Sequence, residues 1–334
     1  MIEDAVDILS QGEDLTPAQM TAVMEEIMIG NAQTPEIISF LVALDKKGES
    51  IEEITAAGAV MRKHAAKINS RHKTILDTCG TGADKRGTFN ISTAVAFVAS
   101  GAGVVVAKHG NRAVSSRCGS ADVLEELGVN INMPPEVLER CLDDIGIVFL
   151  FAPNLHPAMK YAMPARKQLG RKTIFNILGP LSNPAGATHQ IMGVYDKRWV
   201  EILANVLKNL GTAHALVVHG EDGLDEITTT TKTLISEVVG GEVKSYQICP
   251  EDFGIQKALL NDLEGLDAAL NAKILLDILN GKSSPQRDIV ALNAAAAIYA
   301  ADKADSIKEG IKLAVESIDS GSALKKLNLL RGYS

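Results

Sequence analysis

The sequence predicts a small all-helical domain followed by a larger α/β domain with a mostly parallel central sheet. At 334 residues the chain exceeds the roughly 250–300 at which a single core usually stops growing, so two domains are expected. Helix start and stop signals fill residues 1–67, whereas short apolar runs alternate with helical segments from residue 73 onward. Such alternation is typical of a sheet that is covered by helices on both faces.

The helical prediction for residues 1–67 depends on capping signals and apolar spacing. Thr16 and Thr34 each precede a proline, and Ser50 with Glu53 forms a capping box. Apolar residues then recur at helical spacing, so each helix has one face to bury. We expect core packing rather than chemistry from this region.

The α/β prediction depends on continuous apolar runs that are separated by helical segments. Strands are expected at residues 74–78, 103–107, 146–151, 190–195 and 213–219. Helices are expected between them at residues 90–100, 119–127, 135–144 and 197–210.

A proline-rich interruption and a changed C-terminal pattern complete the domain assignment. The alternation stops after residue 152, and about 155–188 is expected to return to the helical domain over a cleft. Residues 225–250 are β-rich, and helices rich in alanine follow from 285. The helical domain is therefore assigned to 1–67 with the returning segment, and the α/β domain to 73–154 and 189–334.

Composition excludes several classes of function. The net charge of −8 and the pI of about 5.5 argue against a nucleic-acid partner, which needs a basic surface. The four cysteines form no Cys-x-x-Cys pair, and no apolar stretch approaches the roughly 20 residues of a membrane span. We expect a cytoplasmic protein with no membrane partner.

The most informative stretch is the glycine-rich loop at residues 77–93. Glycines at 80, 82 and 87 follow an apolar strand, and Asn90 opens the next helix. Glycine lets the main chain approach a ligand closely, and a helix N-terminus offers unpaired N–H groups to an anion. The spacing fits neither the dinucleotide fingerprint nor the Walker loop. The loop alone leaves two readings open, a phosphate site or a glycine-rich loop without a ligand.

Two further loops follow predicted strands and carry opposite charge. Residues 108–120 contain a lysine, two arginines, three serines and two glycines, which suit phosphate binding, although a solvated basic loop has the same composition. Residues 221–226 contain adjacent carboxylates that suit Mg2+, although an acidic surface turn would look the same. Their pairing favours a substrate with several phosphates, which needs both cationic donors and a metal.

Two single residues add to this pattern. Ser92, at the start of the helix, could give Mg2+ an oxygen ligand. Arg166, in the proline-rich segment, could hold a carboxylate with two parallel hydrogen bonds, whereas a surface salt bridge is the plainer reading of this residue alone.

Six motifs in order along most of the chain closely resemble the anthranilate phosphoribosyltransferases, a family of tryptophan biosynthesis. They lie at residues 77–82, 88–93, 108–112, 119–125, 175–184 and 223–226. The resemblance implies a fold like that of the pyrimidine nucleoside phosphorylases and a homodimer joined through the helical domain. It also implies transfer of the phosphoribosyl group of 5-phosphoribosyl 1-pyrophosphate to the amino group of anthranilate, with Mg2+ as cofactor.

The same resemblance assigns site residues. Lys108, Asn111 and Arg166 are expected to be catalytic; Gly80, Asn111 and Arg166 to contact anthranilate; and Ser92, Asp225 and Glu226 to bind Mg2+. The residues expected to surround phosphoribosyl pyrophosphate are Gly80, Ala83, Asp84, Thr88, Asn90, Ile91, Ser92, Thr93, Lys108, His109, Gly110, Asn111, Arg112, Ala113, Val114, Ser115, Ser116 and Ser120.

One departure and two alternatives accompany this assignment. Ala83 stands where the family commonly has glycine, so the loop could close differently, and Lys85-Arg86 makes its tip more basic than usual. The alternatives are a pyrimidine nucleoside phosphorylase and a non-catalytic relative that binds nucleic acid. The acidic pair favours a metal-diphosphate substrate, and the net negative charge argues against nucleic acid.

Overall fold

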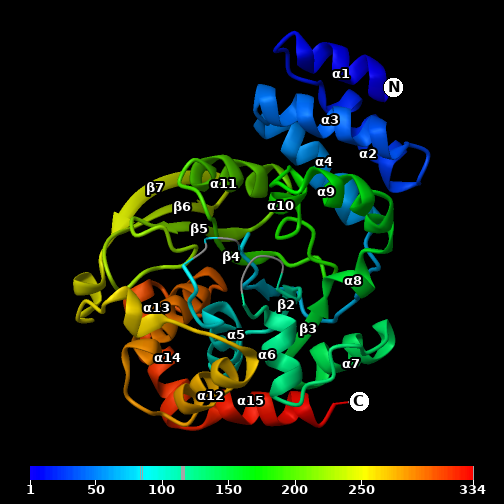
Figure 1. Cartoon of the computed structure of the whole chain (residues 1–334). Coiled ribbons are helices and arrows are strands. Elements are labelled where there is room, and N and C mark those ends of the chain that lie inside the picture. Colours follow the sequence, from blue (N-terminus) through cyan, green and yellow to red (C-terminus); the bar gives the residue numbers. More distant parts are fainter. Residues whose placement is uncertain (83, 85, 114–116, 334) are drawn as a thin grey trace.

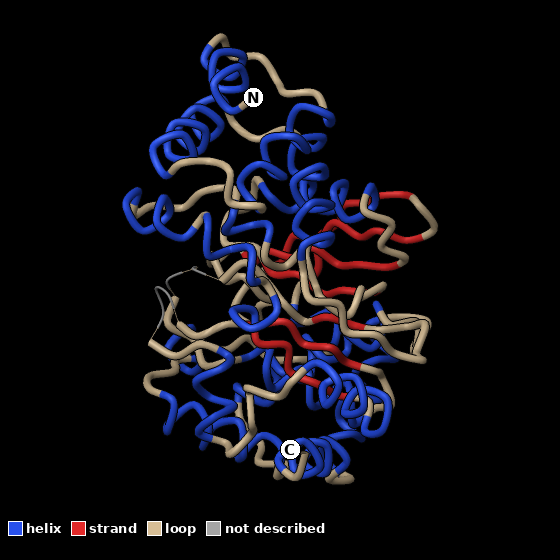
Figure 2. The backbone as a smooth tube through the Cα atoms, turned by 90° about the vertical axis from the view of Figure 1, so that its right-hand side faces the viewer, coloured by secondary structure: helices blue, strands red, loops and turns tan. Residues whose placement is uncertain are grey.

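The computed structural model describes residues 1–82, 84, 86–113 and 117–333. It confirms the predicted fold class: an N-terminal helical part lies above an α/β part with a central sheet (Figure 1). The helical part consists of α1 (Ile2–Ser10), α2 (Pro17–Met28), α3 (Thr34–Lys47) and α4 (Ile51–His64). Figure 2 shows the strands between helices above and below, with the two chain termini at opposite ends.

Two of the three predicted caps form as expected. The side chains of Thr16 and Ser50 accept hydrogen bonds from Gln19 and Glu53 backbone N–H groups. Thr34 is wrong as a cap, because α3 already includes it and Gln33 has the extended cap conformation (φ −83°, ψ 153°). The proline therefore occupies the second position of α3, where no backbone N–H is needed.

The sheet has seven strands in the order β3-β2-β1-β4-β5-β6-β7. The first five strands along the chain are parallel, and the last two pair antiparallel. They are β1 (Leu76–Asp77), β2 (Val106–Gly110), β3 (Ile147–Phe151), β4 (His189–Gly193), β5 (His214–Gly220), β6 (Thr233–Val239) and β7 (Glu242–Ile248).

The second strand differs from its predicted range of 103–107. Residues 102–104 close the preceding helix instead, because Ala102 and Val104 donate backbone hydrogen bonds to carbonyls of its last turn. The strand consequently extends to Gly110 and contains Lys108 and His109. These two residues were expected in a loop, and they lie in the sheet.

Helices cover both faces of the sheet. On one face, α5 and α13 contact the strands and α12, α14 and α15 pack on them, while α11 contacts β5, β6 and β7 on the other. These helices and the remaining short ones are α5 (Ile91–Gly101), α6 (Ser120–Glu126), α7 (Pro135–Ile145), α8 (Ala152–Leu155), η1 (Pro157–Tyr161), α9 (Met163–Leu169), α10 (Phe175–Leu178), α11 (Trp199–Asn209), η2 (Pro250–Phe253), η3 (Leu260–Leu263), α12 (Ala268–Leu279), α13 (Pro285–Ala300), α14 (Ile307–Asp319) and α15 (Ser322–Arg331).

The alternation of side chains along each strand divides the interior into two cores. Leu216 and Val218 of β5 belong to the core with α5 and α13, whereas Ala215 and Val217 belong to the core with α11. The helical part contributes to the second core, since α4 packs against α11. Its apolar faces are therefore buried against the α/β part as well as against one another.

The chain passes between the two parts in three adjacent segments. Ala66 and Ile68 donate backbone hydrogen bonds to Leu155 and Pro184, which are near the two ends of the proline-rich segment. Within that segment, α9 packs against α3, and α10 against α4. The domain boundaries themselves remain a prediction.

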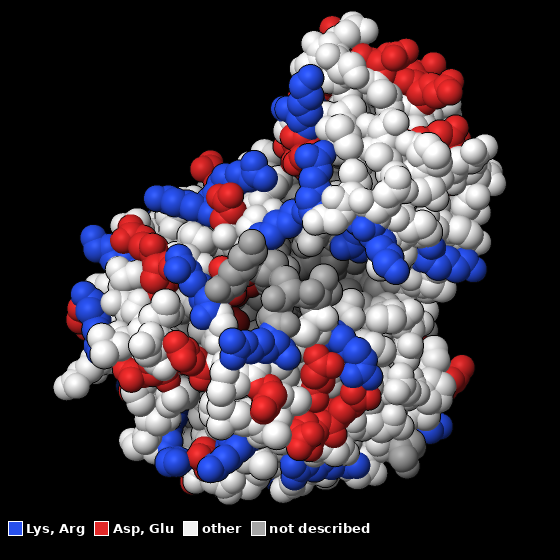
Figure 3. Space-filling view, viewed as in Figure 1, with Lys and Arg blue, Asp and Glu red and all other residues white. Residues whose placement is uncertain are grey.

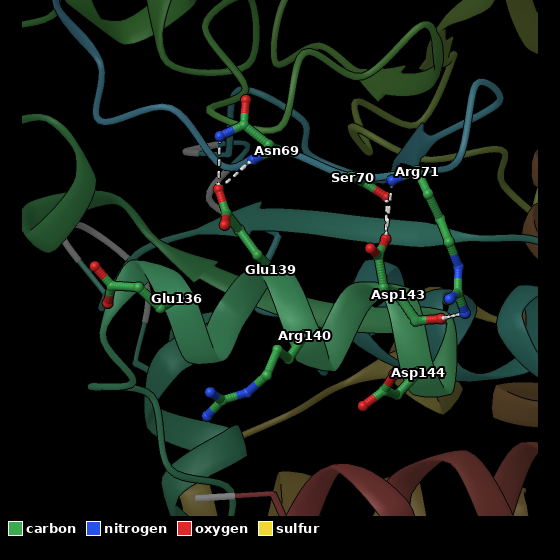
Figure 4. A pocket seen from close by; sticks show the side chains of 8 residues that line it. All are labelled: Asn69, Ser70, Arg71, Glu136, Glu139, Arg140, Asp143 and Asp144. Carbon is green, nitrogen blue, oxygen red and sulfur yellow. Dashed lines mark hydrogen bonds between the residues drawn. The ribbon is translucent and has the colours of Figure 1, made fainter.

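Residues 69–71 of the connection are fixed to α7 in an open hollow, shown in Figure 4. Glu139 accepts hydrogen bonds from the backbone and side-chain nitrogens of Asn69, and Asp143 accepts them from Ser70 Oγ and Arg71 N. This hollow shares no residue with the predicted site. Its polar groups hold the connection in place.

Across the described ranges, no helix is both long and apolar enough to cross a membrane.

Candidate active site

The three loops that the sequence singled out follow the carboxyl ends of three parallel strands, at one edge of the sheet. The glycine-rich loop follows β1, the basic loop follows β2, and the acidic loop follows β5. Ligands of open α/β sheets gather at this edge. In the space-filling view, Lys and Arg side chains lie around the hollow between the helical part and the α/β part (Figure 3).

A buried carboxylate, Asp77, fixes the base of the site. It accepts hydrogen bonds from the backbone N–H groups of Cys79 and His109, both at 3.0 Å, and from Asn183 Nδ2 at 2.7 Å. Burial raises the pKa of Asp77 to about 6, while Asn183 and the charge of Lys108 oppose the increase. The sequence analysis assigned Asp77 no function; it joins β1, β2 and the proline-rich segment.

Asp77, Cys79 and His109 also form a group whose potential ligand atoms lie within 4.8 Å of one another. The Asp77 oxygens already accept three hydrogen bonds. Burial raises the pKa of the Cys79 thiol, which disfavours the thiolate that a metal needs. The group is therefore better explained as structural than as a zinc site.

Gly193, the last residue of β4, brings the glycine-rich and acidic loops together. Its carbonyl accepts a hydrogen bond from Thr81 N at 2.8 Å. A Cβ atom on Gly80 would lie 2.7 Å from this carbonyl, and one on Gly193 would overlap the Asp225 carbonyl oxygen. Three main chains thus meet where no side chain fits. The sequence analysis missed Gly193, because this residue lies inside the strand predicted at residues 190–195 and nothing there reveals that the Asp225 backbone approaches it.

Lys108 supplies a fixed positive charge at the start of α5. Its side chain leaves β2 and is 4% exposed, and Nζ donates to Ser92 Oγ at 3.2 Å and to Thr78 Oγ1 at 3.3 Å. Burial raises the pKa of the Glu226 carboxyl, and the charge of Lys108 opposes this increase. Because a strand holds its backbone, the ammonium group has a defined position above the sheet.

Three carboxylates converge near this ammonium group. Burial, and then the charge of Asp84, raise the pKa of Asp225; burial, and then the charge of Asp225, raise that of Glu226. Asp84 Oδ2 is buried and has no hydrogen-bond partner among the residues that the structure describes. Crowded carboxylates with an unpartnered oxygen form the hard, all-oxygen donor set that Mg2+ prefers. Ser92 lies at the same place through its contact with Lys108.

The first turn of α5 lies beside this cluster. Asn90 is its N-cap residue, but the Asn90 side chain makes no capping hydrogen bond. Thr93 is 1% exposed, and its Oγ1 has no partner. The side chain of Ile91 is buried in the core, so only its backbone is available to a ligand, and Thr88 pairs with Glu264 in an isolated bridge.

The predicted site residues in and after β2 have different surroundings in the structure. Arg112 forms ion pairs with Asp122 and Glu125 of α6. Ser120 Oγ donates to the Asn111 carbonyl at 3.2 Å, and Ala113 N donates to Asp122. A Cβ atom on Gly110 would collide with Ser120, which explains glycine there. Ala83, Val114, Ser115 and Ser116 lie outside the described residues.

The proline-rich segment contributes His156 and Arg166. His156 Nε2 is 3.2 Å from His109 Nε2, and burial lowers the pKa of these histidines to about 4 and about 3. Both rings are therefore neutral at pH 7. Arg166 lies 5.6 Å from the Phe175 ring, and no acidic partner is recorded for it within the described residues. Its guanidinium is available to an anion.

A Gly193→Ala variant should lose stability and activity together. Its Cβ atom would displace the Asp225 backbone, at a cost of about 1–3 kcal/mol in the free energy of unfolding. Urea denaturation measures the first effect, and turnover of the remaining folded protein measures the second. Gly211→Ala offers a comparison for backbone strain, since Gly211 has φ +81° with open space around it. A Gly193→Ala protein with normal turnover would contradict the role given to this close approach.

Two family models match the chain. The helical bundle domain of a glycosyl transferase family matches residues 3–65, and the a/b domain of that family matches residues 72–324. The anthranilate phosphoribosyltransferase of Alkaliphilus metalliredigens is 52% identical, over 99% of this chain and 97% of the relative.

Solved structures agree with these matches. The anthranilate phosphoribosyltransferase of Thermus thermophilus has a TM-score of 0.94 and 42% identity, and 99% of each chain is covered. The Saccharomyces cerevisiae enzyme in complex with PRPP and Mg has a TM-score of 0.91 and 29% identity, over 99% of this chain and 97% of that one. This chain belongs to the anthranilate phosphoribosyltransferase family.

Proposed function

We propose that this chain transfers the phosphoribosyl group of 5-phosphoribosyl 1-pyrophosphate to the amino group of anthranilate, in tryptophan biosynthesis. The observation that carries the proposal is the convergence of Lys108, the carboxylates of Asp225 and Glu226, and the uncapped start of α5. A sugar diphosphate needs this combination of cation, metal ligands and N–H donors. The names of the relatives agree with it and favour it over a nucleoside phosphorylase or a nucleic-acid-binding relative.

The donor set described above fits Mg2+, with Ser92, Asp225 and Glu226 as its ligands. When bound, Mg2+ would neutralise the charge that develops on the departing pyrophosphate. Lys108 acts from the sheet side, where its buried ammonium group needs no rearrangement as that charge grows. The residues predicted to surround phosphoribosyl pyrophosphate complete the pocket as proposed contacts.

We assign anthranilate to the side of the proline-rich segment. Arg166, without an acidic partner in the described residues, would bind the anthranilate carboxylate, and Asn111 and Gly80 would complete the contacts. The aromatic amine is a neutral nucleophile at pH 7, so the reaction needs alignment more than a strong base. The neutral His109–His156 pair nearby is consistent with a site that adds no further positive charge.

Replacing Asp225 and Glu226 together by asparagine and glutamine should lower Mg2+-dependent turnover about a hundredfold or more. The amides keep the shape of the side chains but lose the charge that holds Mg2+. Fluorescence of anthranilate follows its consumption at several Mg2+ concentrations. Glu221→Gln is the matched control, because this residue of the same loop is exposed and its side chain accepts a hydrogen bond from Gln247. Unchanged turnover in the double variant would remove the pair from the mechanism.

An Arg166→Ala variant should raise the KM for anthranilate by about ten- to a hundredfold, because one charge-assisted contact of about 1.5–3 kcal/mol is lost. The KM for phosphoribosyl pyrophosphate should stay within about twofold of the wild-type value. Steady-state kinetics with each substrate varied in turn separate the two effects. Lys167→Ala, at the exposed neighbouring position, is the control. A selective loss of phosphoribosyl pyrophosphate affinity would reverse the substrate assignment.

We also propose a cytoplasmic homodimer joined through the helical part. Met1, Ile29, Val42 and Met163 expose large apolar side chains on this part and on α9, which packs against it. Light scattering should give twice the chain mass of 35.5 kDa. Val42→Glu should shift the mass toward the monomer, whereas Leu259→Glu, an exposed site on the α/β part, should not. A monomeric wild-type protein would refute the proposal.

A further inference from the structure

The side chain of Asn90 is turned away from the helix that it begins. Asparagine is among the preferred N-cap residues, where its oxygen usually accepts a hydrogen bond from the N–H two or three positions later. In this chain Asn90 Oδ1 instead accepts hydrogen bonds from Asn271 Nδ2 at 3.0 Å and from Cys118 Sγ at 3.4 Å, and Asn90 Nδ2 donates to the Cys118 carbonyl at 3.2 Å. The first turn of α5 consequently has no side-chain cap.

Asn271 is itself held on its other side. It lies in the first turn of α12, is 2% exposed, and its Oδ1 accepts a hydrogen bond from Leu266 N at 3.0 Å. The segment before α12 runs beside the end of the glycine-rich loop: Gly265 N donates to the Gly87 carbonyl, and Phe89 N donates to the Leu263 carbonyl. A Cβ atom on Gly265 would lie 2.6 Å from Asn271 Oδ1 and from Phe89 Cα. The amide of Asn271 therefore has one defined orientation.

Two groups in the first turn of α5, the Ser92 N–H and the Thr93 hydroxyl, lie beside the proposed site. Burial raises the pKa of the Glu226 carboxyl, and the Ser92 backbone N–H opposes this increase. Thr93 Oγ1, one residue further, is buried without a partner among the described residues. The Thr93 N–H already donates to the Asn90 carbonyl at 3.1 Å, so if the Asn90 side chain turned back to cap α5, its oxygen would compete for the Ser92 N–H.

We propose that Asn271 is a positioning residue that holds Asn90 away from α5, so that the start of this helix stays open to a substrate phosphate and to Glu226. This inference rests on the proposed function. Asn271 touches no substrate in this account and acts only through Asn90. None of the six motifs that carry the family resemblance includes it.

The test is a double-mutant cycle with Asn271→Ala and Asn90→Ala. Asn271→Ala alone should weaken binding of phosphoribosyl pyrophosphate about tenfold, measured by calorimetry with Mg2+, because the Asn90 side chain then keeps only its contacts with Cys118 among the described residues and can turn to cap α5. The KM for anthranilate should stay within about twofold. In the Asn90→Ala background, where no side chain remains to form the cap, the additional loss of Asn271 should change affinity less than twofold.

Two controls keep the result interpretable. Asn280→Ala removes an asparagine at the other end of the same helix, whose amide bonds only the Leu276 carbonyl, and should leave affinity unchanged. If Asn271→Ala fails to fold, Asn271→Asp keeps an oxygen at the position that accepts the Leu266 hydrogen bond but has no amide to donate to Asn90, and it takes its place in the cycle. Equal losses in both backgrounds would show a merely structural role and overturn the inference. Failure of the wild-type protein to bind phosphoribosyl pyrophosphate would instead overturn the proposed function.

Discussion

The site depends on the buried carboxylate of Asp77. Removing a carboxylate from water is costly unless hydrogen bonds replace its hydration, and Asp77 receives three, from Cys79, His109 and Asn183. Each donor belongs to a different segment that carries proposed functional residues: the glycine-rich loop, β2 and the proline-rich segment. A displacement of any of these segments would leave part of a buried charge without a partner. The hydrogen bonds of this buried carboxylate therefore fix the positions of three chain segments relative to one another.

The charged side chains near Asp77 are positioned before any substrate binds. Burial raises the pKa values of Asp225 and Glu226, and repulsion among the carboxyls of Asp84, Asp225 and Glu226 raises them further. Lys108 offsets part of this repulsion from below, and Gly193 allows the main chains to approach closely enough to create it. The folded chain therefore holds unfavourable electrostatic energy that a divalent cation would relieve. Such preorganisation is how a site can favour a charged transition state without moving.

The sequence predicted the architecture well because the signals for it are local. Proline and hydroxyl caps, apolar runs and glycine loops each act within a few residues, and parallel strands bring their carboxyl ends to one edge. The prediction was less accurate where contacts with another element determine the structure of a segment. Lys108 proved to be a strand residue, because Ala102 to Val104 are used to close α5. Arg112 pairs with two acidic residues of α6, which its loop sequence does not reveal.

The contacts that sequence reasoning missed join residues that are far apart in the chain. Asn271 contacts Asn90 across 181 positions, and Asn183 contacts Asp77 across 106, so no local pattern contains either pair. His109 and His156 meet only because β2 and the proline-rich segment run past each other. Gly193 looked ordinary within its own strand, since the need for glycine comes from the Asp225 backbone.

The second core, which the helical part shares with α11, has a consequence for how the molecule denatures. Arg62 of α4 donates to the carbonyls of Leu181 and Leu210, and apolar side chains continue from α4 across α11 to β5. Deleting the first 65 residues would expose to water the apolar side chains of α11 that α4 covers. Residues 3–65 and 72–324 match separate family models, but they share one core. Heat should therefore unfold them in one cooperative transition.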